Sequence, residues 1–195
     1  MDELKRLILE ECPHNPHKMQ DGLFDEFLGA MTEVRLRNRE VLVPYGKMDA
    51  NLYVQRSGIT RYCWFDGEKE KTYGFATPGT VMISYHSHVR RAPSFFQLES
   101  CGQSVVMRIS KTELDAMARR SHEFALWLVD IHLEQLYSNE LRYAVINGQA
   151  KERFRSLVEN RPEIMARVPL KVIASYLGVT PNYLSYLKKV AKTAE

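Results

Sequence analysis

The sequence predicts an α+β protein with a β-rich N-terminal domain of the sandwich or barrel class, one long helix, and a C-terminal helix-turn-helix domain. Three patterns predict this fold. Residues 34–109 alternate short apolar runs with turn-forming residues, residues 121–147 carry apolar stripes at helical spacing, and residues 170–189 fit a helix-turn-helix template. The expected parts are therefore a β domain over 1–120, a dimerisation helix over 121–148 and a helix-turn-helix domain over 149–195.

The composition is that of a globular protein, with 45% hydrophobic and 26% charged residues in a chain of 195. No apolar run approaches the roughly 18 residues that a membrane span needs, and the first residues lack the apolar segment of a signal peptide. We therefore expect a cytoplasmic protein without a membrane partner. Cys12, Cys63 and Cys101 lie far apart in the sequence, which predicts buried free thiols and neither a disulfide framework nor a zinc site.

Charge is unevenly distributed along the chain. Residues 151–195 contain nine Lys or Arg and four acids, a net charge of +5, whereas the whole chain carries +3. The preceding residues are therefore slightly acidic. A basic C-terminal segment on such a body favours a nucleic-acid partner.

One amphipathic helix is expected before the β-rich region. Residues 21–33 place an apolar stripe at helical spacing behind Asp21, a candidate N-cap. Within the β-rich region the clearest hairpin is the run 59–65, followed by Asp66-Gly67 and a return strand near 71–75. Asp-Gly supplies the positive φ angles that a tight hairpin turn needs.

A capping box, Ser110-Lys111-Thr112-Glu113, opens the helical half of the chain. The helix expected over 121–147 has two apolar stripes, and both need cover. We expect one stripe to pack on the β domain and the other on a second subunit; an internal core helix of a monomer is the alternative. The first stripe comprises Leu126, Val129, Leu133, Leu136 and Tyr143, and the second Phe124, Leu128, Ile131 and Val145.

A short segment connects the long helix to the last motif. Gly148 is expected to mark a hinge. A further helix is expected over 149–160, and Arg161-Pro162 should end it because the residue before a proline disfavours helical geometry.

Residues 170–189, LKVIASYLGVTPNYLSYLKK, place the residue types of a helix-turn-helix in order. Ile173 and Ala174 stand where the two helices touch, and Gly178 stands where the turn needs a positive φ. Thr180 is placed to cap the second helix, and Pro181 to begin it, where its missing N–H is no loss. An ordinary αα-hairpin is the alternative interpretation.

In such a motif the second helix lies in the major groove with its N-terminal half against the base edges. Asn182 is the candidate for bidentate pairing with adenine, whereas Lys188 and Lys189 are candidates for phosphate contacts. The predicted DNA-binding residues are Thr180, Asn182, Tyr183, Ser185, Tyr186, Lys188 and Lys189.

The order of these parts resembles the cyclic-AMP receptor protein/Fnr (Crp/Fnr) family of bacterial transcription regulators, in the short-tailed form common in the Bacteroidetes lineage. Residues 47–58, which end in Gly58, the segment 77–82 and the motif 170–189 carry the resemblance. It implies that the β domain is a double-stranded β-helix (jelly roll) like the cyclic-nucleotide-binding domains. It also implies a homodimer on a near-palindromic double-stranded DNA operator. An unknown small-molecule effector and RNA polymerase are further candidate partners.

The sequence departs from the family pattern where cyclic nucleotides bind. Relatives that bind them use a Gly-Glu pair and an Arg, and the corresponding positions hold Ile83, Ser84 and Ala92. A cyclic phosphate would lack its charge-assisted partners, so we expect no tight binding of cyclic AMP. The candidate ligand-binding residues are Ser84, Arg90, Arg91 and Ser94, and the alternative is that they are solvated loop residues.

Two other functions stay open. Relatives often carry Glu or Arg at the Asn182 position and Arg at the Tyr186 position, which is consistent with a ligand-binding module whose helix-turn-helix is degenerate. His86 and His88 invite a cupin-like metalloprotein, but Glu99 follows too late for that motif, so we expect both histidines in a loop. We expect no metal, cofactor or catalytic residue, because no nucleophile–base pair, phosphate loop or cysteine cluster occurs at a recognisable spacing.

Overall fold

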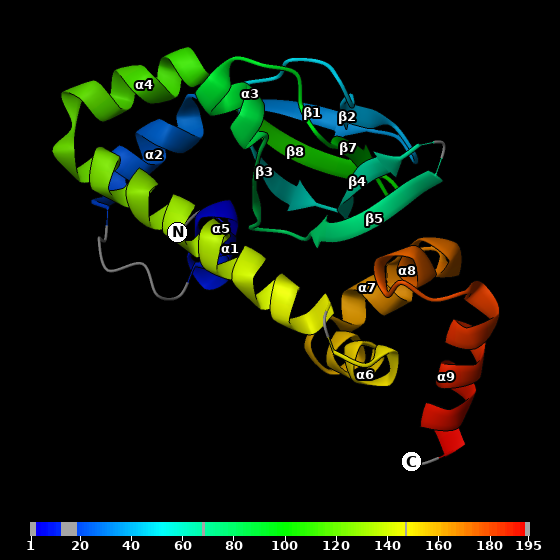
Figure 1. Ribbon diagram of the computed structural model, residues 1–195. Helices are drawn as coiled ribbons and strands as arrows, with labels where there is room; N and C mark the ends of the chain where they lie inside the picture. Colours follow the sequence, from blue (N-terminus) through cyan, green and yellow to red (C-terminus); the bar gives the residue numbers. More distant parts are fainter. Residues whose placement is uncertain (1–2, 13–18, 68, 147, 194–195) are drawn as a thin grey trace.

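The computed structural model describes residues 3–12, 19–67, 69–146 and 148–193. Its β domain consists of two four-stranded antiparallel sheets, ordered β1-β8-β3-β6 and β2-β7-β4-β5 (Figure 1). The expected jelly roll is therefore confirmed. The strands are β1 (Thr32–Leu36), β2 (Val41–Val43), β3 (Leu52–Ser57), β4 (Thr60–Asp66), β5 (Lys69–Ala76), β6 (Val81–Ile83), β7 (Gln97–Ser100) and β8 (Ser104–Ile109).

Side chains from both sheets form one buried core between them. Tyr53 and Met82 come from the first sheet and Leu98 from the second, and all three are buried. Beside them the rings of Tyr62 and Phe96 meet edge to face with centroids 5.3 Å apart. Burial of these large apolar side chains is the main stabilising contribution to the β domain.

The hairpin predicted at Asp66-Gly67 is confirmed. β4 pairs with β5 in antiparallel register, with Asp66 opposite Lys69. Gly67 has a φ of 61°, a conformation that a side chain with a Cβ disfavours.

The helix predicted over 21–33 is shorter than expected. It is α2 (Asp21–Gly29), and Thr32 already belongs to β1, where it pairs with Arg108 of β8. Sheet pairing therefore overrides the helical pattern in the last residues of that range. The predicted cap was also wrong: Gln20 is the N-cap, and the Asp21 carboxylate accepts a hydrogen bond from Lys5 Nζ at 2.5 Å.

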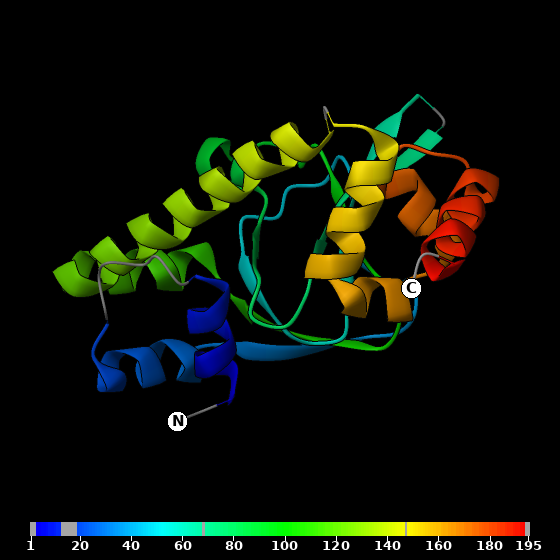
Figure 2. The same cartoon turned by 90° about the horizontal axis from the view of Figure 1, so that it is seen from below.

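Helices α1 (Glu3–Glu11), α2 and α4 (Lys111–Arg120) lie beside the β domain and share a core with it (Figures 1 and 2). The predicted capping box at the start of α4 is confirmed: the Ser110 hydroxyl accepts from the Glu113 N–H at 3.2 Å, and the Glu113 carboxylate accepts from the Ser110 N–H at 3.1 Å.

The long helix α5 (His122–Ile146) has one buried and one exposed apolar face. Phe124, Trp127 and Ile131 are buried against α1, α2 and α4. Val129, Leu133 and Leu136 are 52%, 57% and 62% exposed. The two predicted stripes therefore lie in different environments; the side chains of Tyr143 and Val145 fall outside the described part.

The C-terminal helices pack around a second core, to which Ile59 and Phe75 of the β domain also contribute. They are α6 (Ala150–Asn160), α7 (Pro162–Arg167), α8 (Leu170–Tyr176) and α9 (Pro181–Thr193), and Figure 2 shows them beside β5. The Phe75 and Tyr176 rings lie 5.1 Å apart, and the Thr72 N–H donates to Ser175 Oγ at 3.0 Å. Among the described helices, none has the length and apolar character that a membrane crossing requires.

Candidate nucleic-acid interface

The α8–α9 pair has the geometry that its sequence predicts. The Val179 N–H donates to the Ala174 carbonyl at 3.0 Å, and Gly178 between them has a φ of 64°. Because Gly lacks a Cβ, it takes up this left-handed conformation without strain, and the chain reverses after α8. Ile173, Ala174, Leu177, Leu184 and Leu187 are all buried and hold the two helices together.

α9 begins as predicted. Thr180 Oγ1 accepts from the Tyr183 N–H at 3.2 Å, and Pro181 is the first helical residue. The hydroxyl satisfies one of the backbone donors that every helix start leaves open, so the start of α9 is fixed.

An arginine from α6 joins the motif to the start of the segment that follows α5. Arg153 Nη1 donates to the Gly148 carbonyl at 2.7 Å, and Arg153 Nη2 donates to the Leu177 carbonyl at 2.8 Å. One guanidinium therefore joins Gly148, which lies two residues before α6, to the turn of the helix-turn-helix. The sequence gives no local indication of this contact, because it spans 24 residues.

The predicted DNA-binding residues lie on the exposed side of α9 and at its start. Thr180, Asn182, Ser185 and Lys189 are exposed, whereas Lys188 is half-buried. Tyr183 and Tyr186 are 43% and 58% exposed, and their rings stack with centroids 6.0 Å apart. The face is therefore a polar and aromatic surface, and Leu184 and Leu187 on the opposite side anchor it.

The predicted ligand residues are only partly brought together. Ser84 and Ser94 are buried, and Ser84 Oγ donates to Ser94 Oγ at 3.0 Å, which in turn donates to the Phe96 carbonyl at 2.8 Å. Arg90 and Arg91 are both exposed. The two serines therefore satisfy each other inside the domain, while the two guanidinium groups lie at its surface.

His86 and His88 lie on a helix, α3 (Tyr85–Arg90), so their predicted position in a loop was wrong. Side-chain hydrogen bonds attach α3 to residues outside the helix. His88 Nδ1 donates to the Ala50 carbonyl at 2.7 Å, and Ser87 Oγ donates to the Ala92 carbonyl at 2.8 Å. His86 is stacked on Phe95 with centroids 3.9 Å apart. Among the described residues no group of three or more His, Cys, Asp or Glu could hold a metal ion.

The imidazole rings of His88 on α3 and His132 on α5 lie close together. The rings of His88 and His132 are perpendicular, with centroids 6.4 Å apart. Burial lowers the pKa of His88, and burial together with the nearby His88 and Lys111 lowers the pKa of His132. Both imidazoles are therefore held in their neutral form at neutral pH.

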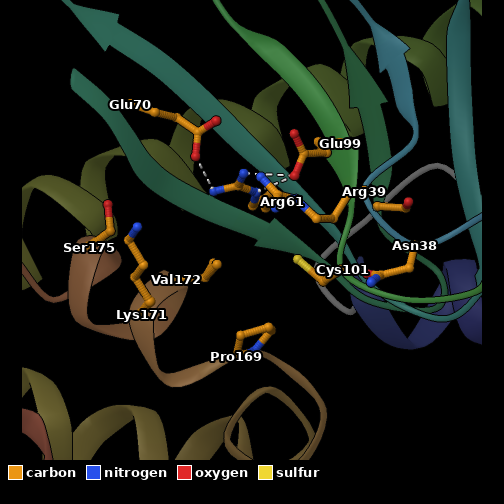
Figure 3. A pocket seen from close by; sticks show the side chains of 11 residues that line it. Asn38, Arg39, Arg61, Glu70, Glu99, Cys101, Pro169, Lys171, Val172 and Ser175 are labelled. Atoms are coloured by element: carbon orange, nitrogen blue, oxygen red, sulfur yellow. Dashed lines mark hydrogen bonds and ion pairs between the residues drawn. The ribbon is translucent and has the colours of Figure 1, made fainter. Parts of the chain in front are cut away.

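A cavity of about 260 Å³ separates the second sheet from α8 (Figure 3). Arg61 projects into it from β4 and is held by Glu99 Oε1 and Glu70 Oε1, each 2.7 Å from a guanidinium nitrogen. Lys171 and Val172 of α8 line the other side. No local pattern in the sequence indicates this cavity, because its lining residues come from separate segments between Asn38 and Ser175.

The fold is that of solved bacterial regulators. The chain is similar to FixK2 from Bradyrhizobium japonicum, with a TM-score of 0.67 and 18% identity over 84% of this chain and 85% of that one. It is also similar to the c-di-GMP responsive regulator CLP of Xanthomonas campestris, with a TM-score of 0.63 and 15% identity over 90% and 93% of the two chains. For the catabolite activator protein of Thermus thermophilus the TM-score is 0.58, with 13% identity over 96% and 87%.

These likenesses confirm, at the level of the fold, the resemblance to the Crp/Fnr regulators. The sequence itself matches no protein-family model and no curated protein.

Proposed function

We propose that this protein is a sequence-specific DNA-binding transcription regulator that acts without catalysis. The observation that carries the proposal is the exposed face of α9, which presents Asn182, Tyr183 and Tyr186 on a helix fixed from behind by Leu184 and Leu187. A helix of this kind fits the major groove, where an Asn side chain pairs bidentately with adenine. The solved proteins of this fold include global and catabolite regulators, which supports the same function.

The protein is proposed to act as a homodimer through α5. Val129, Leu133 and Leu136 form an exposed apolar stripe along this helix, and Tyr137 and Leu141 extend it at 51% and 48% exposure. An apolar stripe of this length favours association with a second copy. Two copies of α9 would then bind the two halves of a near-palindromic operator.

Dimerisation can be tested with two substitutions on α5. Leu133→Glu and Leu136→Glu together place charges in the proposed seam, and sedimentation equilibrium should then give the mass of one chain. Glu134→Gln on the same helix is the matched control and should leave the mass of the dimer unchanged. A variant with both glutamates that keeps the dimer mass would exclude this interface.

The β domain is proposed to respond to a small molecule or a protein partner other than cyclic AMP. Ile83 and Ser84 provide no carboxylate for a ribose, and the Ser84 hydroxyl is already bonded to Ser94. RNA polymerase stays a proposed partner of the DNA-bound dimer. The proposed division is a sensor domain over 1–120, a dimerisation helix over 121–148 and a DNA-binding domain over 149–195.

The decisive experiment selects bound sequences from a random duplex library and compares the winner with scrambled DNA at the same salt concentration. We expect a two-fold symmetric site bound roughly a thousandfold more tightly than scrambled DNA. Lys189→Gln should weaken both complexes, because phosphate contacts carry no sequence information. Binding that is blind to sequence would favour the ligand-binding module, and a stoichiometric transition metal in the purified protein would favour a metalloprotein.

A further inference from the structure

The turn between β1 and β2 concentrates positive charge at the surface of the β domain. The segment 35–40 reads Arg-Leu-Arg-Asn-Arg-Glu, and all of it except Leu36 is exposed. Because side chains alternate along a strand, burial of Leu36 directs Arg35 and Arg37 to the opposite, solvent-facing side. We call residues 37–40 the basic turn.

The basic turn is fixed to the end of β7. The Arg39 N–H donates to the Ser100 carbonyl at 3.0 Å, the Ser100 N–H donates to the Glu40 carbonyl at 3.0 Å, and Ser100 Oγ donates to the Arg37 carbonyl. Arg39 has a φ of 63°, which is uncommon for a residue other than Gly. The backbone of the two arginines is therefore held in place, so little backbone order has to be gained when an anion binds.

The charges of the basic turn are not neutralised within the described part of the chain. Arg35 and Arg56 both pair with Glu33, at 2.8 and 3.1 Å. Neither Arg37 nor Arg39 makes an ion pair with a described residue, and the Glu40 carboxylate accepts from the Arg37 backbone N–H at 2.8 Å. Two guanidinium groups are thus available to an external partner.

The basic turn lies across the cavity from the helix-turn-helix. Asn38 and Arg39 line one side, and Pro169 and Lys171 of the α8 region line another (Figure 3). Lys171 is exposed, as is Arg167 at the end of α7. In helix-turn-helix complexes the first helix of the motif crosses the DNA backbone. The basic turn therefore lies near the α8 region, which would contact phosphates if the motif binds DNA.

We propose that Arg37 and Arg39 bind backbone phosphates of the DNA that flanks the half-site read by α9. The inference rests on the proposed function and adds a second contact region from a different domain. Arginine suits it because its planar guanidinium donates two parallel hydrogen bonds to one phosphate. Such contacts add affinity and fix the path of the DNA, and sequence is still read by α9.

The test compares two duplexes that share the selected operator, one ending at the outer edge of the α9 footprint and one extended by a helical turn on each side. Arg37→Gln with Arg39→Gln should lower the slope of log affinity against log salt by about four on the extended duplex, since each subunit of the dimer loses two phosphate contacts and each lost contact removes close to one. On the short duplex the slope should equal that of the wild type. Arg35→Gln, whose partner is Glu33, is the matched control and should leave both slopes unchanged.

The outcomes separate the two proposals. If the wild type binds specifically and the double variant has the wild-type slope on both duplexes, the basic turn does not contact DNA. An equal loss on both duplexes would likewise contradict a flanking contact. If the wild type shows no specific site at all, the proposed function fails, and this inference fails with it. Lys189→Gln then tests whether α9 contacts DNA, because this substitution should weaken binding to either duplex only if α9 does so.

Discussion

The exposed face of α9 and the α3 segment (residues 84–94) both collect short polar side chains, but they present them in opposite ways. On α9, Asn182 and Ser185 are exposed, and the apolar side chains behind them provide the anchorage. In the α3 segment, Ser84 and Ser94 are buried and bonded to each other. The exposed Asn182 amide can still bond to an external partner, whereas the hydroxyls of the two buried serines already bond inside the domain.

The largest expected effect concerns α9. Asn182→Ala with Tyr186→Ala should lower affinity for the selected operator roughly 100-fold, since a good side-chain contact to a base contributes about 1–3 kcal/mol of discrimination. Affinity for scrambled DNA should change little. Competitive titration of the two duplexes measures the difference, and an equal loss on both would mean that these residues do not read the sequence.

A pair of serine substitutions sharpens the comparison in terms of stability. Ser94→Ala should lower the free energy of unfolding by about 1–3 kcal/mol, because the buried Ser84 hydroxyl loses its nearer acceptor and the Phe96 carbonyl loses a donor. Ser185→Ala, on the exposed side of α9, should change it by less than about 0.5 kcal/mol. Urea denaturation followed by circular dichroism gives both values; the reverse order would show that the α3 segment is open to solvent.

The two regions should also differ in their response to pH. His88 and His132 have pKa values lowered by burial, so the unfolded chain binds protons that the native state excludes. The free energy of unfolding should therefore fall as the pH drops below about 6.5, by at most about 1.4 kcal/mol per pH unit for each histidine. Lys111 and Arg91 disfavour protonation of His88, whereas Asp115 favours it.

His132→Gln isolates this effect. The variant should show a smaller loss of stability between pH 7 and pH 5 in denaturation curves recorded at matched ionic strength. Residues 151–195 contain no histidine, so the operator affinity of the folded dimer should vary less over the same range. A wild-type stability that is level across this interval would contradict burial of the two neutral imidazoles.

The smallest expected effect is that of cyclic AMP. Because a ligand stabilises a protein only in proportion to its binding, millimolar cyclic AMP should leave the melting temperature within about 1 °C. Calorimetric titration should likewise give no saturable heat. A clear rise in melting temperature would require the α3 segment to open and Arg90 or Arg91 to turn inward.

The parts of the fold that depend on neighbouring residues could be predicted from the sequence. Gly178, Thr180 and Pro181 each have a local mechanical reason to stand where they do, and the same holds for the Asp66-Gly67 hairpin and the Ser110 capping box. α3 could not be predicted in this way. Its bonds run from His88 to Ala50 and from Ser87 to Ala92, so tertiary contacts impose a helix that the local pattern does not indicate.

The candidate site also combines features that neighbouring residues determine with features that depend on contacts between distant segments. The exposed face of α9 follows from its helical period once Leu184 and Leu187 are assigned to the core. The contact of Arg153 with Leu177 and the ion pairs of Arg61 with Glu70 and Glu99 join distant segments, and no spacing in the sequence encodes them. The arginines of the basic turn were not predicted as a binding feature from the sequence, and only the fold places Arg39 and Lys171 around one cavity.

The docking of α8 on β5 has a consequence for the integrity of the sheet. β5 is the last strand of its sheet, and the backbone N–H of Thr72 donates to Ser175 of α8 instead of to another strand. An uncovered edge strand offers its open backbone groups to other chains and invites intermolecular strand pairing. The C-terminal helices thus cover part of this edge of the β domain, and any movement that lifts α8 away would expose backbone groups with which another chain could pair.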